Sequence, residues 1–154
     1  MKNASPFSVL KIMHGAMLIG QLLFIAVLFY LVYSKKITPP LTDQDRIFQV
    51  IAIAFAAIAF FAGTSLFKKK ITTLREGFNS TAKEKFEKYR SACIVQWALL
   101  EGACLFCGIC FFLTGNYAFL ALAAVLILLF AMQVPNKTKM ALQLGLSSTD
   151  TDEL

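Results

Sequence analysis

Four long runs of apolar residues, separated by short polar segments, dominate this chain. They cover residues 9–33, 47–67, 92–113 and 117–134, and a polar tail follows at 135–154. A helix that crosses a bilayer needs about 20 apolar residues, because each residue adds about 1.5 Å along the axis and the hydrocarbon core is roughly 30 Å thick. Backbone polar groups in lipid must also be bonded within the segment. The pattern therefore predicts an all-α membrane protein in which four transmembrane helices form a single domain.

The polar segment at residues 68–91 is the longest one between two of these runs. Within it, Thr81 and Glu84 have the spacing of a capping box, in which each side chain bonds the backbone N–H of the other residue. Apolar residues then recur at helical spacing up to the third run. We therefore expect the third transmembrane helix to begin as an amphipathic helix about two turns before the membrane.

The amino-acid composition also indicates that most of the chain lies in lipid. Hydrophobic residues make up 58% of the chain and charged residues 16%, whereas charged residues average about 25% of soluble domains. A formal net charge of +6 would suit a nucleic-acid partner. The basic residues, however, lie beside the apolar runs, where they orient helices and contact anionic headgroups. We expect anionic lipids at the basic segment 68–91 and no nucleic acid.

The distribution of basic residues predicts the orientation in the membrane. Of the 15 lysines and arginines, twelve lie in the N-terminal arm, the segment 68–91 and the tail, and three lie in the loop after the first run. Cytoplasmic loops carry the excess of Lys and Arg. Both termini and the segment 68–91 are therefore predicted to be cytoplasmic, and the other two loops to lie outside.

The first and third runs share a sequence pattern when they are aligned at an offset of 82 residues. The shared pattern A-x-L-x-G-x-x-L-F aligns Gly20 with Gly102. It predicts two pseudo-repeated helical hairpins, although any two apolar helices share Leu and Ala by composition. Small residues let transmembrane helices approach closely. Gly20, Gly102 and Gly108 are therefore predicted to be helix-packing positions.

Glu101 is the one acidic residue inside the apolar runs, and it lies near the middle of the third. A carboxylate at the bilayer centre costs about 2.5 kcal/mol or more, so such a residue is neutral, paired or close to water. The same alignment places Gln21 close to the level of Glu101, and it predicts a hydrogen bond between them. His14, Gln21, Gln96 and Glu101 would then form one polar column for a proton or an ion. Alternatively, His14 and Gln96 are interfacial residues and Glu101 is a structural carboxyl.

The four cysteines all lie in or beside the third run, at Cys93, Cys104, Cys107 and Cys110. The last three resemble a C-x-x-C redox pair or half of a metal site. Neither outer loop supplies a second cysteine pair, and cysteines in a regular helix usually serve as small apolar residues. The sequence also lacks a metalloprotease, P-loop or serine-hydrolase motif. We therefore expect no enzyme activity, no metal and no cofactor.

Two tandem hairpins with a membrane-buried Glu101 resemble, in architecture, the doubled proteolipid rotor subunits of rotary ATPases. The resemblance covers all four runs. Those proteolipids carry G-x-G-x-G runs in the first helix of each hairpin and the carboxylate in the second, whereas Glu101 lies in a first helix here. Proton translocation is therefore not part of what the resemblance implies. The chain is also similar to small four-span proteins of bacterial inner membranes. This similarity implies that it lies in a bacterial inner membrane.

These features predict a non-enzymatic accessory or assembly subunit of a membrane complex, or a homo-oligomeric membrane protein. The alternative is a proton-coupled, ion or small-solute conduit in which Glu101 takes up and releases a proton. A flux through reconstituted protein that is lost in Glu101→Gln would favour the conduit. Co-purification of a stoichiometric partner without any flux would favour the accessory subunit.

Overall fold

The computed structural model describes residues 5–76 and 81–147, and this part of the chain is all-α, as predicted. Its elements are, in order, α1 (Pro6–Tyr33), a 3₁₀ turn (Thr42–Gln44), α2 (Asp45–Glu76), α3 (Ala82–Thr114), α4 (Ala118–Ala131) and α5 (Lys137–Leu144). Three of them, α1, α2 and α3, are long and apolar enough to cross a membrane. Helix α4 is apolar but shorter.

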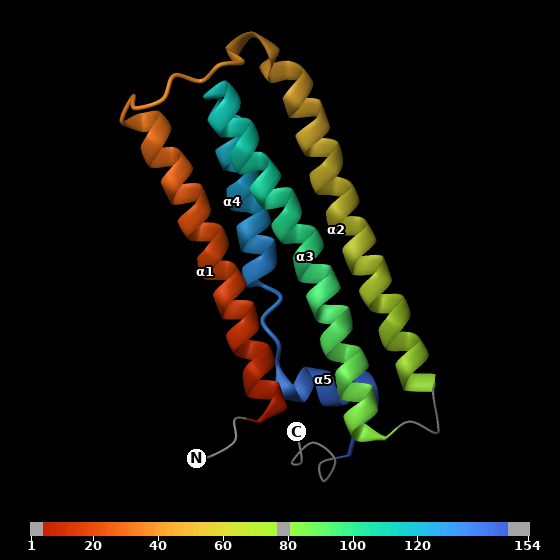
Figure 1. The fold of residues 1–154 in the computed structure, drawn as a ribbon. Coiled ribbons are helices and arrows are strands. Elements are labelled where there is room, and N and C mark those ends of the chain that lie inside the picture. The colour runs from red at the N-terminus through yellow and green to blue at the C-terminus, as the bar shows by residue number, and fades with distance from the viewer. Residues whose placement is uncertain (1–4, 77–80, 148–154) are drawn as a thin grey trace.

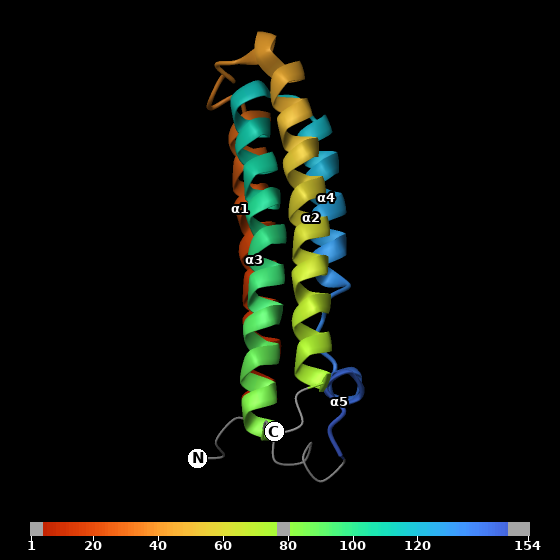
Figure 2. The ribbon, with the colours of Figure 1, turned by 90° about the vertical axis from the view of Figure 1, so that its right-hand side faces the viewer.

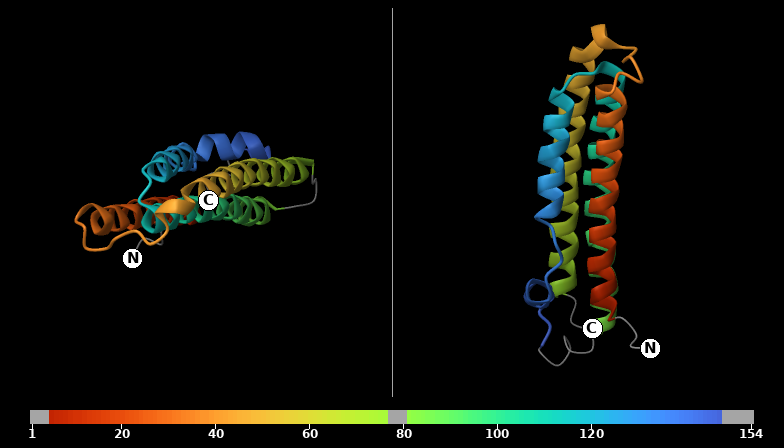
Figure 3. Two further views of the ribbon diagram at one scale, coloured as in Figure 1. Left: turned by 90° about the horizontal axis from the view of Figure 1, so that it is seen from above. Right: turned by 90° about the vertical axis from the view of Figure 1, so that its left-hand side faces the viewer.

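The four longer helices form a bundle of two layers, with α1 beside α3 in one layer and α2 beside α4 in the other (Figures 2 and 3). Helices α1 and α3 run in one direction, and α2 and α4 run in the other (Figure 1). Helix α3 is the central element, because it packs extensively against each of the other three. Helix α5 lies across the end of the bundle at which α1 begins.

Helix α2 continues well past the predicted end of the second run at residue 67. It extends through Lys68, Lys69 and Lys70 to Glu76, because lysine is a good helix former whose charge only requires water at the surface. The inward face of α2 is also continued by Ile71 and Leu74, which are both buried. Much of the segment 68–91 is thus helical rather than a loop.

The start of α3 confirms the predicted capping box. The Glu84 backbone N–H donates to Thr81 Oγ1 at 3.3 Å, and the Thr81 backbone N–H donates to the Glu84 carboxylate at 3.2 Å. Phe86 and Tyr89 in the first turns are buried, so α3 begins amphipathic before it becomes apolar. At its other end the helix ends at Gly115, whose φ of 71° is left-handed.

The fourth apolar run, predicted as a helix over 117–134, forms the shorter helix α4. Its 14 residues extend only about 21 Å, less than a hydrocarbon core of roughly 30 Å. Helix α5 then lies within the predicted polar tail. Asn136 caps it by accepting from the Thr138 and Lys139 N–H groups, and Met140 and Leu144 bury one face against the bundle. The acidic end, 150–154, lies outside the described residues.

The contact between α2 and α3 depends on small side chains. The inward face of α2 through the apolar part consists of four buried small residues, Ala52, Ala56, Ala59 and Gly63. At the last of these, a Cβ would lie 3.5 Å from atoms of both Gln96 and Leu99 on α3. Such residues let two helix backbones approach closely, which is the main source of helix association in lipid.

The close approach of α1 to α3 occurs at Gly108. A Cβ at this position would lie 2.7 Å from Ile25 Cδ1 and 3.0 Å from Phe24 Cε1. Gly20 and Gly102, also predicted as packing positions, meet no other helix among the described residues, because a Cβ at either would have no atom of a neighbouring helix within 4 Å. Both lie on helix faces directed away from the contact, so their alignment in the two runs does not reflect packing.

Replacing Gly108 by Leu should therefore destabilise the bundle, by about 1–3 kcal/mol, because the larger side chain forces α1 away from α3. Gly102→Leu is the matched control, since it makes the same change on the same helix where space is open. Thermal unfolding in detergent measures both. An equal Tm for the two variants would contradict a crossing at Gly108.

Candidate functional site

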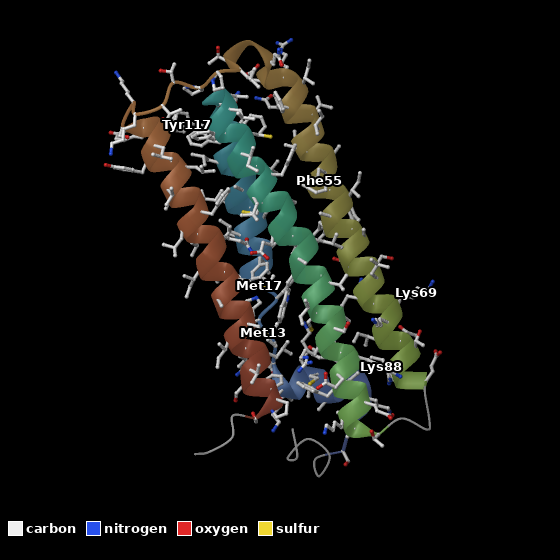
Figure 4. All side chains as sticks on the ribbon, viewed as in Figure 1. Met13, Met17, Phe55, Lys69, Lys88 and Tyr117 are labelled. Atoms are coloured by element: carbon white, nitrogen blue, oxygen red, sulfur yellow. The ribbon has the colours of Figure 1, made fainter. Side chains whose placement is uncertain are left out.

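Helices α1 and α3 keep one register along their contact. The His14 ring contacts the Trp97 ring, and Ile25 lies against Gly108, so both pairs are separated by 83 positions in sequence. Because the two helices run parallel, the same offset sets Gln21 level with Cys104 and Leu18 level with Glu101. We call this contact, with the side chains at its edge, the α1–α3 seam. Figure 4 shows Met13 and Met17 on its α1 side.

His14 is a buried and hydrogen-bonded group in this seam. It is 3% exposed, and its Nε2–H donates to the backbone oxygen of Phe130 at 3.0 Å. Its ring stacks on the Phe130 ring with centroids 4.7 Å apart and meets the edge of Trp97 at 4.9 Å. The Phe130 carbonyl, in the last turn of α4, also accepts from the Gln133 backbone N–H at 2.9 Å, and its oxygen has two lone pairs. His14 therefore joins α1, α3 and α4.

Gln21 lies two turns further along the same face of α1 and has a different environment. Its side chain is 0% exposed, and neither its amide nitrogen nor its amide oxygen has a hydrogen bond within the described part of the chain. The predicted hydrogen bond to Glu101 is therefore not formed. An unpaired polar group of this kind costs roughly 1–3 kcal/mol of folding free energy. Gln21 is therefore an unsatisfied polar residue in an otherwise apolar layer.

Glu101 lies at the edge of the seam and is partly exposed. It precedes Gly108 by seven residues, two turns of the helix, so both lie on similar faces of α3. The register then places Met17, Leu18 and Gln21 opposite Glu101 on α1. Among the described residues, the carboxyl makes no hydrogen bond and no ion pair; Cys104 on the next turn is a neighbour. The register thus places Glu101 within about one turn of the level of Gln21, and the two side chains share no hydrogen bond.

Gln96 does not belong to this group, so the single polar column that the sequence predicts does not exist. Five residues separate it from Glu101, which corresponds to about 140° around the helix. Its side chain lies against Gly63 of α2 and lines a cavity at the α5 end of the bundle. The seam therefore holds His14, Gln21 and Glu101, while Gln96 lies on another face of α3.

The four cysteines are free thiols and all are buried. Cys104 donates weakly to the backbone oxygen of Ala123 at 3.9 Å, which places it against α4. Among the described residues, no group of three His, Cys, Asp or Glu side chains is close enough to hold a metal ion. These thiols fill the interface of α3 with its neighbours.

The sequence reasoning missed the groups around Pro135. Gln133 and Gln143 have buried side-chain oxygens without a hydrogen bond among the described residues, and both line the cavity that Gln96 lines. The sequence feature that could have indicated this site is Pro135 followed by Asn136. Proline ends one helix, and asparagine is a common N-cap of the next.

Comparisons with known protein families, with curated proteins and with solved structures found no match to this chain.

The bonding of His14 predicts a graded loss of stability. His14→Phe should cost about 0.5–1.5 kcal/mol, because it keeps the stacking but loses one hydrogen bond. His14→Ala should cost more, because it also leaves a cavity between three helices. Ile12→Ala, at an exposed position of the same helix, is the control. Thermal unfolding in detergent gives the order of stability of the variants. An equal loss of stability in His14→Phe and His14→Ala would contradict the stacked arrangement.

Proposed function

We propose that this chain is a non-enzymatic accessory subunit of the membrane, and that it binds another transmembrane helix along the α1–α3 seam through Glu101. The observation that carries the proposal is the position of Glu101, partly exposed at the seam with no hydrogen bond or ion pair to any described residue. The partner is a second copy of this chain or a helix of another membrane protein.

The physical argument rests on the solvent. Lipid tails offer no hydrogen bond, so a carboxyl at this depth is stabilised only by another polar group or by water. A partner helix with a Ser, Thr, Asn or Gln side chain at the seam would supply that group. Large hydrophobic side chains are exposed along α1 and α2, as expected for faces in contact with lipid or with other helices.

A proton or ion conduit is the second candidate, and the two unbonded groups at the seam favour it. Gln21 and Glu101 lie level with each other within about one turn, and neither has a partner among the described residues. The bundle interior is closed by large, fully buried side chains, including Trp97, Phe111, Phe119 and Phe130. A proton path would therefore follow the seam rather than the bundle axis.

In the proposed topology the two termini are cytoplasmic and four segments cross the inner membrane, with α4 and the residues after it making the last crossing. Anionic lipids would contact the basic residues of 68–91.

Fusions of a reporter protein test this topology. Alkaline phosphatase fused after Gly115 should be active, because it works only outside the cytoplasm. Green fluorescent protein fused after Gly145 should fluoresce, because that position is cytoplasmic in the proposed topology. The opposite pattern would reverse the orientation.

The proposed interface is tested by substituting Glu101. Glu101→Leu should abolish co-purification of the partner, or the native oligomer, because no hydrogen bond can form. Glu101→Gln should retain most of it, because an amide still donates and accepts. Ile109→Ala, at an exposed position of the same helix, should have no effect.

The conduit is tested with the same variants. Proton flux into vesicles that contain the purified chain alone, lost in Glu101→Gln, would support the conduit and contradict the accessory subunit. Loss of a stoichiometric partner in Glu101→Leu, with no flux from the original chain, would support the accessory subunit.

A further inference from the structure

A half-open cavity of about 140 Å³ lies at the α5 end of the bundle, lined by residues of α2, α3, α5 and the segment between α4 and α5. The cavity exists because α4 ends at Ala131, whereas the first turns of α3 extend further toward this end of the bundle. The chain must therefore cross this end before α5 begins. By the same measure a water molecule needs about 10–15 Å³, so the space suits a molecule of roughly ten heavy atoms. We call it the α5 cavity.

The polar lining of the α5 cavity is positive and rich in amides. Lys139 is its charged residue, and none of the described residues that line it is acidic. The side-chain oxygens of Gln133 and Gln143 are buried there without a hydrogen bond from any described residue. Buried polar atoms are normally bonded, and an unbonded one costs roughly 1–3 kcal/mol. Gln133 and Gln143 are partly exposed residues, so their amides leave bonding capacity that a ligand in the cavity can use.

The rim of the α5 cavity is apolar. Met132 and Val134 line it and are 81% and 56% exposed. Tyr89 and Cys93, also in the lining, lie at the start of the apolar run of α3, which is the depth of the lipid headgroups when that run crosses the membrane. A polar, positive space with an exposed apolar rim at this depth fits a molecule with a polar head and an apolar chain.

We propose that the α5 cavity binds the headgroup of an anionic phospholipid that carries hydroxyl groups, as phosphatidylglycerol does. The phosphate pairs with Lys139, and the glycerol hydroxyls bond the amides of Gln133 and Gln143. A hydroxyl both donates and accepts, so it suits either end of an amide. The acyl chains lie against Met132 and Val134. This inference rests on the membrane location proposed above and not on the interface at Glu101.

Trp97 is the single tryptophan of the chain and lines the α5 cavity, so its fluorescence reports occupancy. The full chain is placed in phosphatidylcholine vesicles with a small fraction of lipid brominated near the top of its acyl chains. Brominated phosphatidylglycerol should quench Trp97 more than brominated phosphatidylcholine or phosphatidic acid at the same mole fraction. Lys139→Met should lower the relative affinity for phosphatidylglycerol about fivefold, the effect of one lysine near a lipid surface.

Lys137→Met is the matched control, because it removes the same charge from the same helix at a residue that does not line the cavity. It should leave the preference for phosphatidylglycerol unchanged. Gln133→Leu with Gln143→Leu should remove the preference over phosphatidic acid, which lacks the glycerol hydroxyls. The emission maximum without bromine checks that each variant keeps Trp97 buried.

Three results would overturn the proposal. Equal quenching by all brominated lipids would show that the cavity selects no headgroup. An equal loss of relative affinity for phosphatidylglycerol in Lys137→Met and Lys139→Met would show a diffuse effect of surface charge. Relief of quenching by soluble glycerol phosphate at low millimolar concentration would identify a soluble phosphate ester as the ligand in place of a lipid. Proteins altered only at Glu101 should behave as the original chain in this assay, which separates this test from that of the seam.

Discussion

The bundle depends on close backbone contact along α3, which packs against α1, α2 and α4. In lipid, burying an apolar side chain between helices gains little from the hydrophobic effect, since the tails are equally apolar. Association then depends on van der Waals contact, which falls off steeply as atoms separate. The small residues on α2, such as Ala56 and Gly63, and Gly108 on α3 provide that contact. Helices α1 and α2 are thus held against α3 by the close fit of their surfaces.

The same solvent gives the polar groups of the seam their importance. His14 is buried with a hydrogen bond, because the Phe130 carbonyl at the end of α4 accepts from His14 in addition to the Gln133 backbone N–H. Gln21 and Glu101, two turns or less away, have no such bond among the described residues. One histidine therefore stabilises the bundle, while Gln21 and Glu101 leave bonding capacity that a partner or a proton can use.

The length of α4 determines the character of the α5 end of the bundle. A full-length fourth helix would fill the space beside Trp97 with its own side chains and leave no room for a ligand. Because α4 ends at Ala131, the chain crosses that end through Pro135, and α5 covers it with Met140 and Leu144 inward. The cavity and its two unbonded amides follow from this short helix.

The sequence by itself determined the helical class, the three long apolar helices and the capped start of α3, because these depend on the composition and periodicity of contiguous residues. It also singled out His14, Gln21 and Glu101, because polar residues are rare in apolar runs. Only the tertiary structure decided which of them are bonded, that Gly108 rather than Gly102 meets α1, and that Gln96 faces α2. The physical reason is that a contact between helices depends on their rotation and register. Those are set by side-chain shape along the whole interface, which an alignment of two apolar runs does not contain.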